Sequence, residues 1–220
     1  MRSQLLVASV AAAGVLAATG AALAGAASEA SLTVPSKADL YYAGLATVPS
    51  PGLQNGGGLP VLYRLPSGAH RVLTVSATRG TLNWGPGSPN FGADGDQTGN
   101  TLGGVTNIKG YRGLSGIHMR RDQLFLAGVF LGASAPKPPA PPRLSEANAS
   151  SAAALAPRLQ QVFPIGDGRT SSGTVQRFTV PAGATRLYLG YTDADGFSGP
   201  PGFYDDNTGS IRAVLEVTHS

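Results

Sequence analysis

Short runs of apolar residues, separated by glycine, proline and aspartate, recur along the chain from residue 38 onward. Such runs, bounded by turn residues, predict β-strands. They fall at residues 38–42, 61–65, 71–77, 123–131, 175–180, 186–191 and 211–217. Apolar and polar residues roughly alternate in 71–75 and 211–217, which is typical of strands with one buried face. The longer apolar run 123–131 predicts a central strand.

Two long connections separate these strands. The first, 83–110, is rich in Gly, Asp and Asn, and long structured loops in compact domains are often functional. The second starts with the proline tract 136–142, and its segment 147–160 has room for one short helix interrupted at Pro157. Because sequential strands usually pair, we expect 186–191 and 211–217 to be antiparallel neighbours.

The composition also favours strands over helices. The 220 residues include 31 Gly and 17 Pro, and only 13% are charged, which favours many short strands joined by tight turns. Residues 27–220 suffice for one domain with a substantial core. The expected fold is all-β: a jelly-roll-like antiparallel β-sandwich, galactose-binding-domain-like, with a Pro-rich insertion around 133–161.

The first 26 residues have the pattern of a secretory signal peptide. Arg2 is the only charge before Glu29, and the residues between them are mostly Leu, Val and Ala. A short positive start, an apolar stretch and small residues at its end are typical of such signals. An uncleaved membrane anchor is the alternative, but the small residues favour cleavage after Ala24 or Ala26. We therefore expect a secreted or extracytoplasmic protein, in the periplasm or at the cell surface, with no membrane span in the mature chain.

The residue types restrict the chemistry. The absence of cysteine excludes disulfides, thiol nucleophiles and zinc–thiolate sites. The formal net charge of +4 comes from scattered basic residues. Their densest group is Arg112, Arg120 and Arg121, without an interleaved aromatic platform, so we expect no nucleic-acid partner.

Carboxylates gather near the end of the chain. Four of the nine Asp residues are Asp193, Asp195, Asp205 and Asp206. They repel one another unless a cation or hydrogen bonds compensate, and calcium takes oxygen ligands of the kinds found here. A solubilising hairpin whose Asp and Asn side chains form turns is equally compatible with the composition.

Two stretches resemble one family. Residues 189–193 followed by 204–210 (Tyr-Asp-Asp-Asn-Thr-Gly-Ser) resemble the calcium loop of the bacterial galactophilic lectins of the PA-I type. Trp84-Gly85-Pro86, followed by Phe91 to Asp96, resembles a second stretch of the same lectins. The stretches come in the family's order, and the resemblance covers 71–132 and 175–217.

The resemblance implies a small jelly-roll sandwich with one calcium ion at its rim that coordinates two sugar hydroxyls. The implied metal ligands are the backbone carbonyls of Trp84 and Phe203 and the side chains of Asp193, Asp206 and Asn207. Nearby candidates for contact with the bound ligand are Asp94, Asp96, Tyr204 and Asp205.

The chain also departs from the family. Residues 197–202 have no counterpart, and Asp206 stands where the family has an amide. The family's sugar-contacting His and Gln fall near Gly99 and Leu102, which cannot make the same hydrogen bonds. The resemblance therefore implies the fold and the calcium site, and it does not imply galactose specificity.

An enzyme is not expected. The chain has no Gly-x-Ser-x-Gly elbow and only three His residues. Asp193 and Asp206 resemble a glycosidase pair, but the implied calcium would occupy them. Two hypotheses remain: a calcium-dependent, lectin-like module that binds a glycan or polysaccharide, and a structural cell-surface or matrix domain in which calcium only stabilises the loops.

Overall fold

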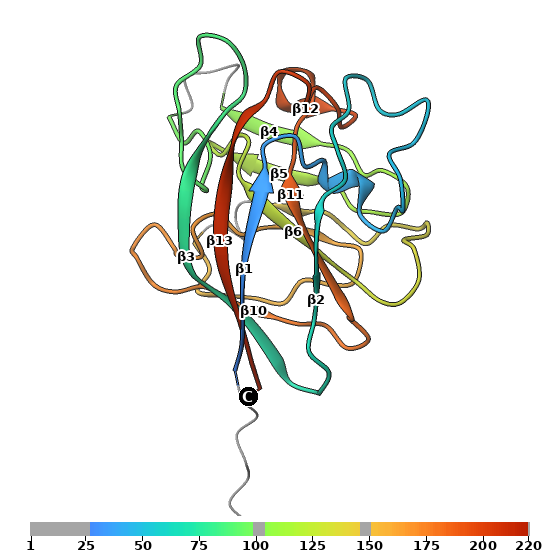
Figure 1. Ribbon diagram of the computed structural model, residues 1–220, viewed down its shortest axis with the longest axis vertical. Helices are drawn as coiled ribbons and strands as arrows, with labels where there is room; N and C mark the ends of the chain where they lie inside the picture. Colours follow the sequence, from blue (N-terminus) through green and yellow to red (C-terminus); the bar gives the residue numbers. More distant parts are fainter. Residues whose placement is uncertain (1–26, 99–103, 146–150, 220) are drawn as a thin grey trace, which may run out of the picture.

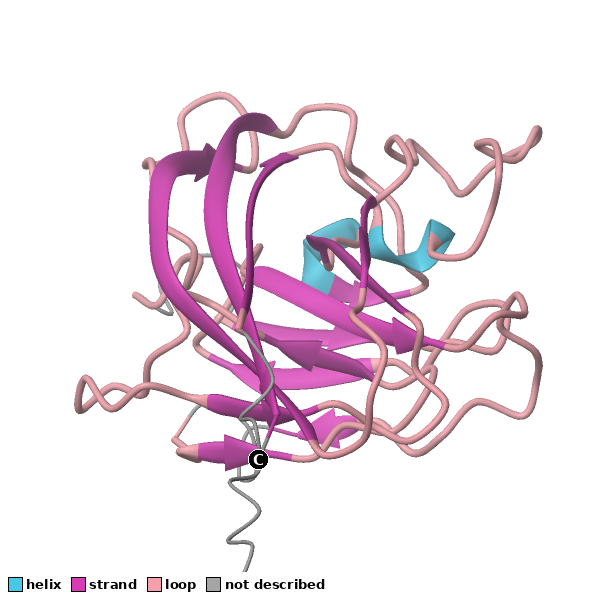
Figure 2. Cartoon of the chain, turned by 60° about the horizontal axis from the view of Figure 1, so that its bottom comes forward, coloured by secondary structure: helices cyan, strands magenta, loops and turns pink. Residues whose placement is uncertain are grey.

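A computed structural model describes residues 27–98, 104–145 and 151–219. The predicted signal peptide, 1–26, lies outside the described residues. Strands form three sheets that pack together (Figure 1), which confirms the all-β sandwich predicted from the sequence. Figure 2 shows that helix is confined to short turns beside the strand layers.

The first sheet carries the longest strands, in the order β1-β13-β3-β10-β8. Its members are β1 (Ser28–Pro35), β13 (Thr208–His219), β3 (Arg71–Asn83), β10 (Arg177–Thr179) and β8 (Ala154–Leu155). In β13 every second residue from Ile211 to Val217 is fully buried. This confirms the alternation seen in the sequence, with the apolar face turned to the core.

The second sheet has the order β2-β11-β6-β9 and is antiparallel throughout. It consists of β2 (Val61–Arg64), β11 (Arg186–Tyr191), β6 (Leu126–Leu131) and β9 (Val162–Pro164). All six residues of β6 are buried, because the strand has a hydrogen-bonded neighbour on each side and apolar side chains on both faces. The prediction of a central strand in 123–131 is confirmed.

A smaller third sheet has the order β12-β4-β5-β7. Its strands are β12 (Ser198–Gly199), β4 (Val105–Ile108), β5 (Ile117–Arg120) and β7 (Leu144–Ser145). The pairs β12–β4, β5–β7 and β8–β10 are parallel, so the predicted antiparallel sandwich also contains parallel pairs at these short strands. Each of them arises from a long connection, which can return in either direction.

Aromatic side chains hold the two main sheets together. Phe163 of β9 stacks on Phe130 of β6, with ring centroids 5.0 Å apart, and lies 5.4 Å from Phe178 of the first sheet. The Tyr191 hydroxyl of β11 donates to the carbonyl of Val34 in β1 (2.9 Å). Buried aromatic pairs of this kind add to the stabilisation from apolar burial.

The predicted pairing of 186–191 with 211–217 is wrong. Strand β11 pairs with β2 and β6, whereas β13 pairs with β1 and β3. The loop between them therefore crosses from one sheet of the sandwich to the other. From β9 to β11 and on to β13 the chain alternates between the two main sheets, as in a jelly roll, and such alternation prevents sequential strands from pairing.

Two local expectations are also wrong. Residues 38–42 do not form a strand, because Leu40–Tyr42 is a short 3-10 helix, η1, whose first turn is capped by the Asp39 side chain. Within 147–160, residues 151–160 are not helical and include strand β8. Asp39 explains the first error, since an Asp side chain that accepts a hydrogen bond two residues ahead favours a turn over a strand.

Three loops meet at one end of the sandwich, at the top of Figure 1. The loop after η1 contacts the 192–207 loop, because the amides of Phe203 and Tyr204 donate to the carbonyls of Gln54 and Asn55. The turn that follows β3 joins them through Trp84, whose ring packs edge-on against Phe197 with centroids 6.2 Å apart. This loop end contains most of the residues that the lectin resemblance singles out.

Candidate functional site

Asp193 is the central buried carboxylate of the loop end. It lies two residues after the end of β11 and is only 3% exposed. Its Oδ1 accepts from the amide of Ala194 (2.8 Å) and its Oδ2 from Nδ2 of Asn207 (2.7 Å). Burial raises the pKa of Asp193 well above its usual value, the two hydrogen bonds lower it, and the neighbouring charges of Asp206 and Asp39 raise it further.

Asn207 places an unsatisfied acceptor beside this carboxylate. The residue is 1% exposed, and its Oδ1 has no hydrogen-bond partner. The hydroxyl of Thr192, one residue before Asp193, is likewise buried without a partner. Buried polar atoms are nearly always satisfied, so the unsatisfied Oδ1 of Asn207, whose Nδ2 donates to the Asp193 carboxylate, suggests a site for a ligand.

Tyr204 fixes the base of the loop. Its hydroxyl donates to the carbonyl of Tyr191 (2.9 Å) and accepts from the amide of Asp193 (3.1 Å). The side chain is fully buried. Tyr204 therefore acts here as a structural link between the two ends of the loop, and its ring is not exposed to cover a sugar.

Asp206 faces the turn that follows β3. A Cβ added to Gly85 would lie 2.8 Å from Oδ2 of Asp206, so the carboxylate rests directly on the glycine backbone. The two residues line a shallow cavity of about 330 Å³ together with Asn83, Pro86 and Gly87. Because Asp206 is exposed, this cavity is an open side of the loop end.

The remaining predicted metal ligands lie at the same end. The Trp84 ring contacts Phe197, and its buried Nε1 has no hydrogen-bond partner. Phe203 has a left-handed backbone, with φ of 68°, which is rare for a residue with a side chain. The structure thus brings Trp84 and Phe203 to the loop that holds Asp193, Asp206 and Asn207.

Lys37 is a member of the loop end that the sequence did not indicate. Its Nζ donates to the carbonyl of Asp205, an exposed residue. Burial raises the pKa of Asp206, a hydrogen bond from its own amide lowers it, the Asp205 charge raises it and the Lys37 charge lowers it. The positive charge of Lys37 therefore partly offsets the negative charge of the acidic loop.

Asp39 is a second buried carboxylate that sequence reasoning missed. It has no exposed surface, and its Oδ1 accepts from the amide of Tyr41 (2.8 Å). Burial raises its pKa to about 7, although hydrogen bonds, first that from Tyr41, oppose the shift. An Asp inside the apolar run 38–42 was the available signal, since an ionisable residue in a buried segment is unusual.

The other two predicted ligand contacts lie on the chain after the Trp84 turn. Asp94 accepts from the amide of Asp167 (2.8 Å) and lines a different, larger cleft. Asp96 is 2% exposed, and its Oδ1 accepts from the amide and hydroxyl of Thr98. Gly99 and Leu102, where the lectins carry sugar-contacting residues, lie outside the described residues.

Neither the side-chain clusters of the described residues nor any similarity to known proteins assigns a further function to the chain. Within the described ranges, no group of three or more His, Cys, Asp or Glu side chains is placed to hold a metal ion. No helix in that part of the chain is long and apolar enough to cross a membrane. No protein-family model matches the sequence, and no curated protein matches it.

Proposed function

We propose that the protein is an exported, non-catalytic, calcium-dependent carbohydrate-binding module whose ion site is formed by Asp193, Asp206 and Asn207. The observation that carries this proposal is the unsatisfied Oδ1 of Asn207, a 1% exposed acceptor beside a buried carboxylate. An acceptor left without a donor in such surroundings is costly, and a bound cation would remove that cost.

The chemistry of these donors fits calcium. Hard cations take carboxylate, amide and carbonyl oxygens, and the loop end supplies all three kinds. Asn207 now donates from Nδ2 to Asp193. Turning its carboxamide would exchange Nδ2 for Oδ1 and present an oxygen beside Oδ2 of Asp193. Calcium, when bound, would supply open coordination positions for two hydroxyls of one sugar.

Access to the site supports a sugar ligand. Asp206 borders the shallow cavity beside Gly85 and Pro86, and it is exposed. A ligand that entered there would reach the loop end from the side of the Trp84 turn. Because a glycine and a proline form this wall, no long side chain occupies the approach.

One observation favours the second hypothesis, a structural domain with a stabilising ion. Asp193 and Asn207 are 3% and 1% exposed, so an ion held by these two residues alone would be enclosed in the loop. Its only role would then be to fasten β11 to β13 across the two sheets. The exposure of Asp206 supports the carbohydrate-binding proposal, because a third ligand at the surface would keep the ion within reach of a sugar.

A glycan array with the mature chain, probed in calcium and again in EDTA, separates the two functions. The carbohydrate-binding proposal predicts signals in calcium that disappear in EDTA and in the Asp193→Ala variant. The matched variant Asp167→Ala, which removes an Asp outside the loop end, should keep the calcium-dependent signals. Calcium binding by calorimetry without any calcium-dependent glycan signal would contradict the carbohydrate proposal and favour the structural one.

A further inference from the structure

A large cleft lies apart from the 192–207 loop. Its volume is about 1080 Å³, at the upper end of the range of roughly 300–1,000 Å³ that is usual for small-ligand sites. Most of its lining comes from three segments: the loop 94–97 after β3, strand β5 with the residues that follow it, and residues 164–176 from the end of β9 toward β10. Ser145 at the end of β7 and Ser151 complete the lining. It therefore has room for more than a single small ligand group.

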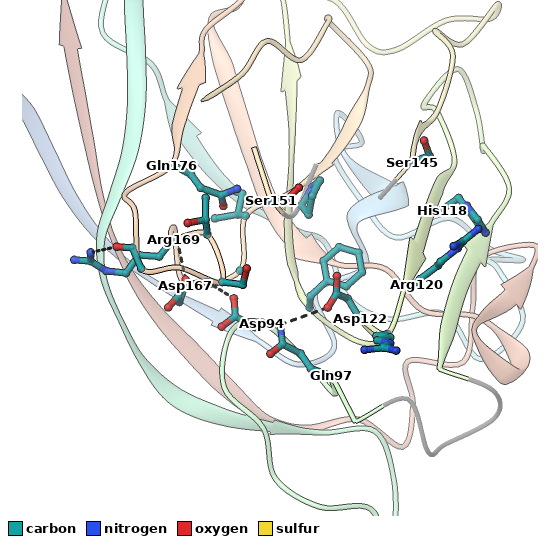
Figure 3. A pocket seen from close by; sticks show the side chains of 18 residues that line it. Asp94, Gln97, His118, Arg120, Asp122, Ser145, Ser151, Asp167, Arg169 and Gln176 are labelled. Carbon is teal, nitrogen blue, oxygen red and sulfur yellow. Dashed lines mark hydrogen bonds between the residues drawn. The ribbon is translucent and has the colours of Figure 1, made fainter. Parts of the chain in front are cut away.

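Opposite charges line the cleft in equal number. Three carboxylates (Asp94, Asp122 and Asp167) and three guanidinium groups (Arg120, Arg121 and Arg169) belong to its lining, so these six side chains sum to zero formal charge. Figure 3 shows Asp167 and Arg169 on one side and His118 with Arg120 on the other. Hydrogen-bond donors and acceptors thus lie on both sides of the cleft, and positive and negative charges are balanced.

Two of the carboxylates are positioned by the backbone. Asp94 Oδ1 accepts from the amide of Asp167, and Asp167 Oδ1 accepts from the amide of Arg169, both at 2.8 Å. Among the described residues, no hydrogen bond reaches the Oδ2 atom of either carboxylate. Each side chain therefore presents one acceptor to the cleft while its other oxygen holds it in place.

Amide and apolar groups complete the lining. The exposed Gln97 donates from Nε2 to Oδ1 of Asp122 (3.4 Å). Phe125 and Ile165, each 1% exposed, lie beneath the polar groups. Because these two apolar side chains are almost fully buried, the planar carboxylate, carboxamide and guanidinium groups are what the cleft presents, and they are suited to a ligand rich in hydroxyls.

From this lining we infer that the cleft is a second, calcium-independent binding site, for a neutral, hydroxyl-rich chain such as an oligosaccharide of several units. A hydroxyl donates to a carboxylate and accepts from a guanidinium, so it can use both kinds of side chain at once. A polyanion would face three carboxylates, and a polycation would face three guanidinium groups. The proposed binding in the cleft does not depend on the calcium site.

The test is NMR shift mapping on the isotope-labelled mature chain in EDTA. The probes are cellotetraose, maltotetraose and mannotetraose, with tetragalacturonate and the glucosamine tetramer as charged comparators. We expect at least one neutral tetrasaccharide to shift the resonances of the cleft, with Gln97, Asp167 and Arg169 among them, and to bind more tightly than both charged probes. Arg169→Ala should weaken this binding about tenfold, since a hydrogen bond from a charged group is lost.

Two control variants change residues outside the cleft. Arg79→Ala removes an exposed arginine from β3 and should leave the affinity unchanged. Asp193→Ala should also leave it unchanged, and that separates the cleft from the calcium site. If no neutral tetrasaccharide shifts cleft resonances in EDTA, or if tetragalacturonate binds more tightly than every neutral probe, the inference is wrong, whatever the calcium-dependent array shows.

Discussion

The protein has two groups of aspartates, and the same side chain has a different environment in each. At the loop end, Asp39 and Asp193 are almost fully buried, and both accept hydrogen bonds from amide groups. In the cleft, Asp94 and Asp167 are partly exposed and share their surface with three arginines. A buried carboxylate without a nearby cation is expensive, whereas a partly exposed one facing guanidinium groups is not.

The comparison indicates that the aspartates of the loop end are suited to a cation and those of the cleft to a neutral ligand. At the loop end burial raises the pKa of Asp193, and the charges of Asp206 and Asp39 raise it further. A divalent cation would relieve both the repulsion and the unsatisfied Oδ1 of Asn207. The cleft already has its compensating charges on the protein, so what it offers to a ligand is hydrogen bonding.

The largest expected effect is a pH dependence that originates at Asp39. Its pKa in the folded protein is about 7, above the ordinary value of 3.8. The folded protein therefore keeps a proton that the unfolded chain has released, and stability is full below about pH 4 and declines as the pH rises through 7. In Asp39→Asn the group no longer titrates, and asparagine can still accept from the Tyr41 amide.

Chemical denaturation in EDTA at pH 5 and pH 8 measures this effect. The free energy of unfolding of Asp39→Asn, relative to the unchanged protein, should increase by roughly 2–3 kcal/mol between the two pH values. Asp167→Asn, in the cleft, is the control variant. A difference for Asp39→Asn that is the same at both pH values would show that this carboxylate is not protonated in the folded state.

The next effect in size concerns the hydroxyl of Tyr204. Tyr204→Phe removes one bond to the Tyr191 carbonyl and one from the Asp193 amide, and both partners stay buried. The expected loss of unfolding free energy is about 2 kcal/mol. Tyr63→Phe is the matched control, because the Tyr63 hydroxyl has only a 3.3 Å contact with Ser28 in a partly buried position. Equal losses in the two variants would contradict a special role of Tyr204 at the loop end.

A smaller effect is expected at Asp206, which is exposed. Asp206→Asn should raise stability in EDTA by a few tenths of a kcal/mol, because repulsion between surface charges is weak. The same variant should bind calcium more weakly in a calorimetric titration, since an amide oxygen replaces a carboxylate. Asp167→Asn serves as the control for the titration. Unchanged calcium affinity in Asp206→Asn would remove this residue from the proposed site.

The sequence predicted the strands more reliably than the way they pair. Burial can be read directly from the sequence, by the alternation in 211–217 and by the continuous apolar run 123–131. The strands predicted from these two patterns are confirmed. Pairing depends on where a loop sends the chain, and the 192–207 loop leads from one sheet to the other. The edge strand β1 was missed, because its residues are only partly buried and carry a weak apolar pattern.

Within the candidate site, the sequence identified residues that are close along the chain. Asp193, Asp206 and Asn207 belong to one loop, so a local cluster of carboxylates and amides was enough to find them. Asp39 and Lys37 come from a segment that is distant in the sequence. Only the folded structure brings this segment, between β1 and η1, next to the 192–207 loop. The cleft was missed for the same reason, since its lining comes from several segments that are far apart in the sequence.

The most direct test of the calcium site is the melting temperature of residues 27–220 in calcium and in EDTA. A ligand at a hundred times its Kd stabilises the fold by about 2.7 kcal/mol, so calcium should raise the melting temperature clearly. The rise should vanish in Asp193→Ala and remain in Asp167→Ala. If the unchanged protein melts at the same temperature in calcium and in EDTA, the loop end holds no such ion and the proposed calcium-dependent function is wrong.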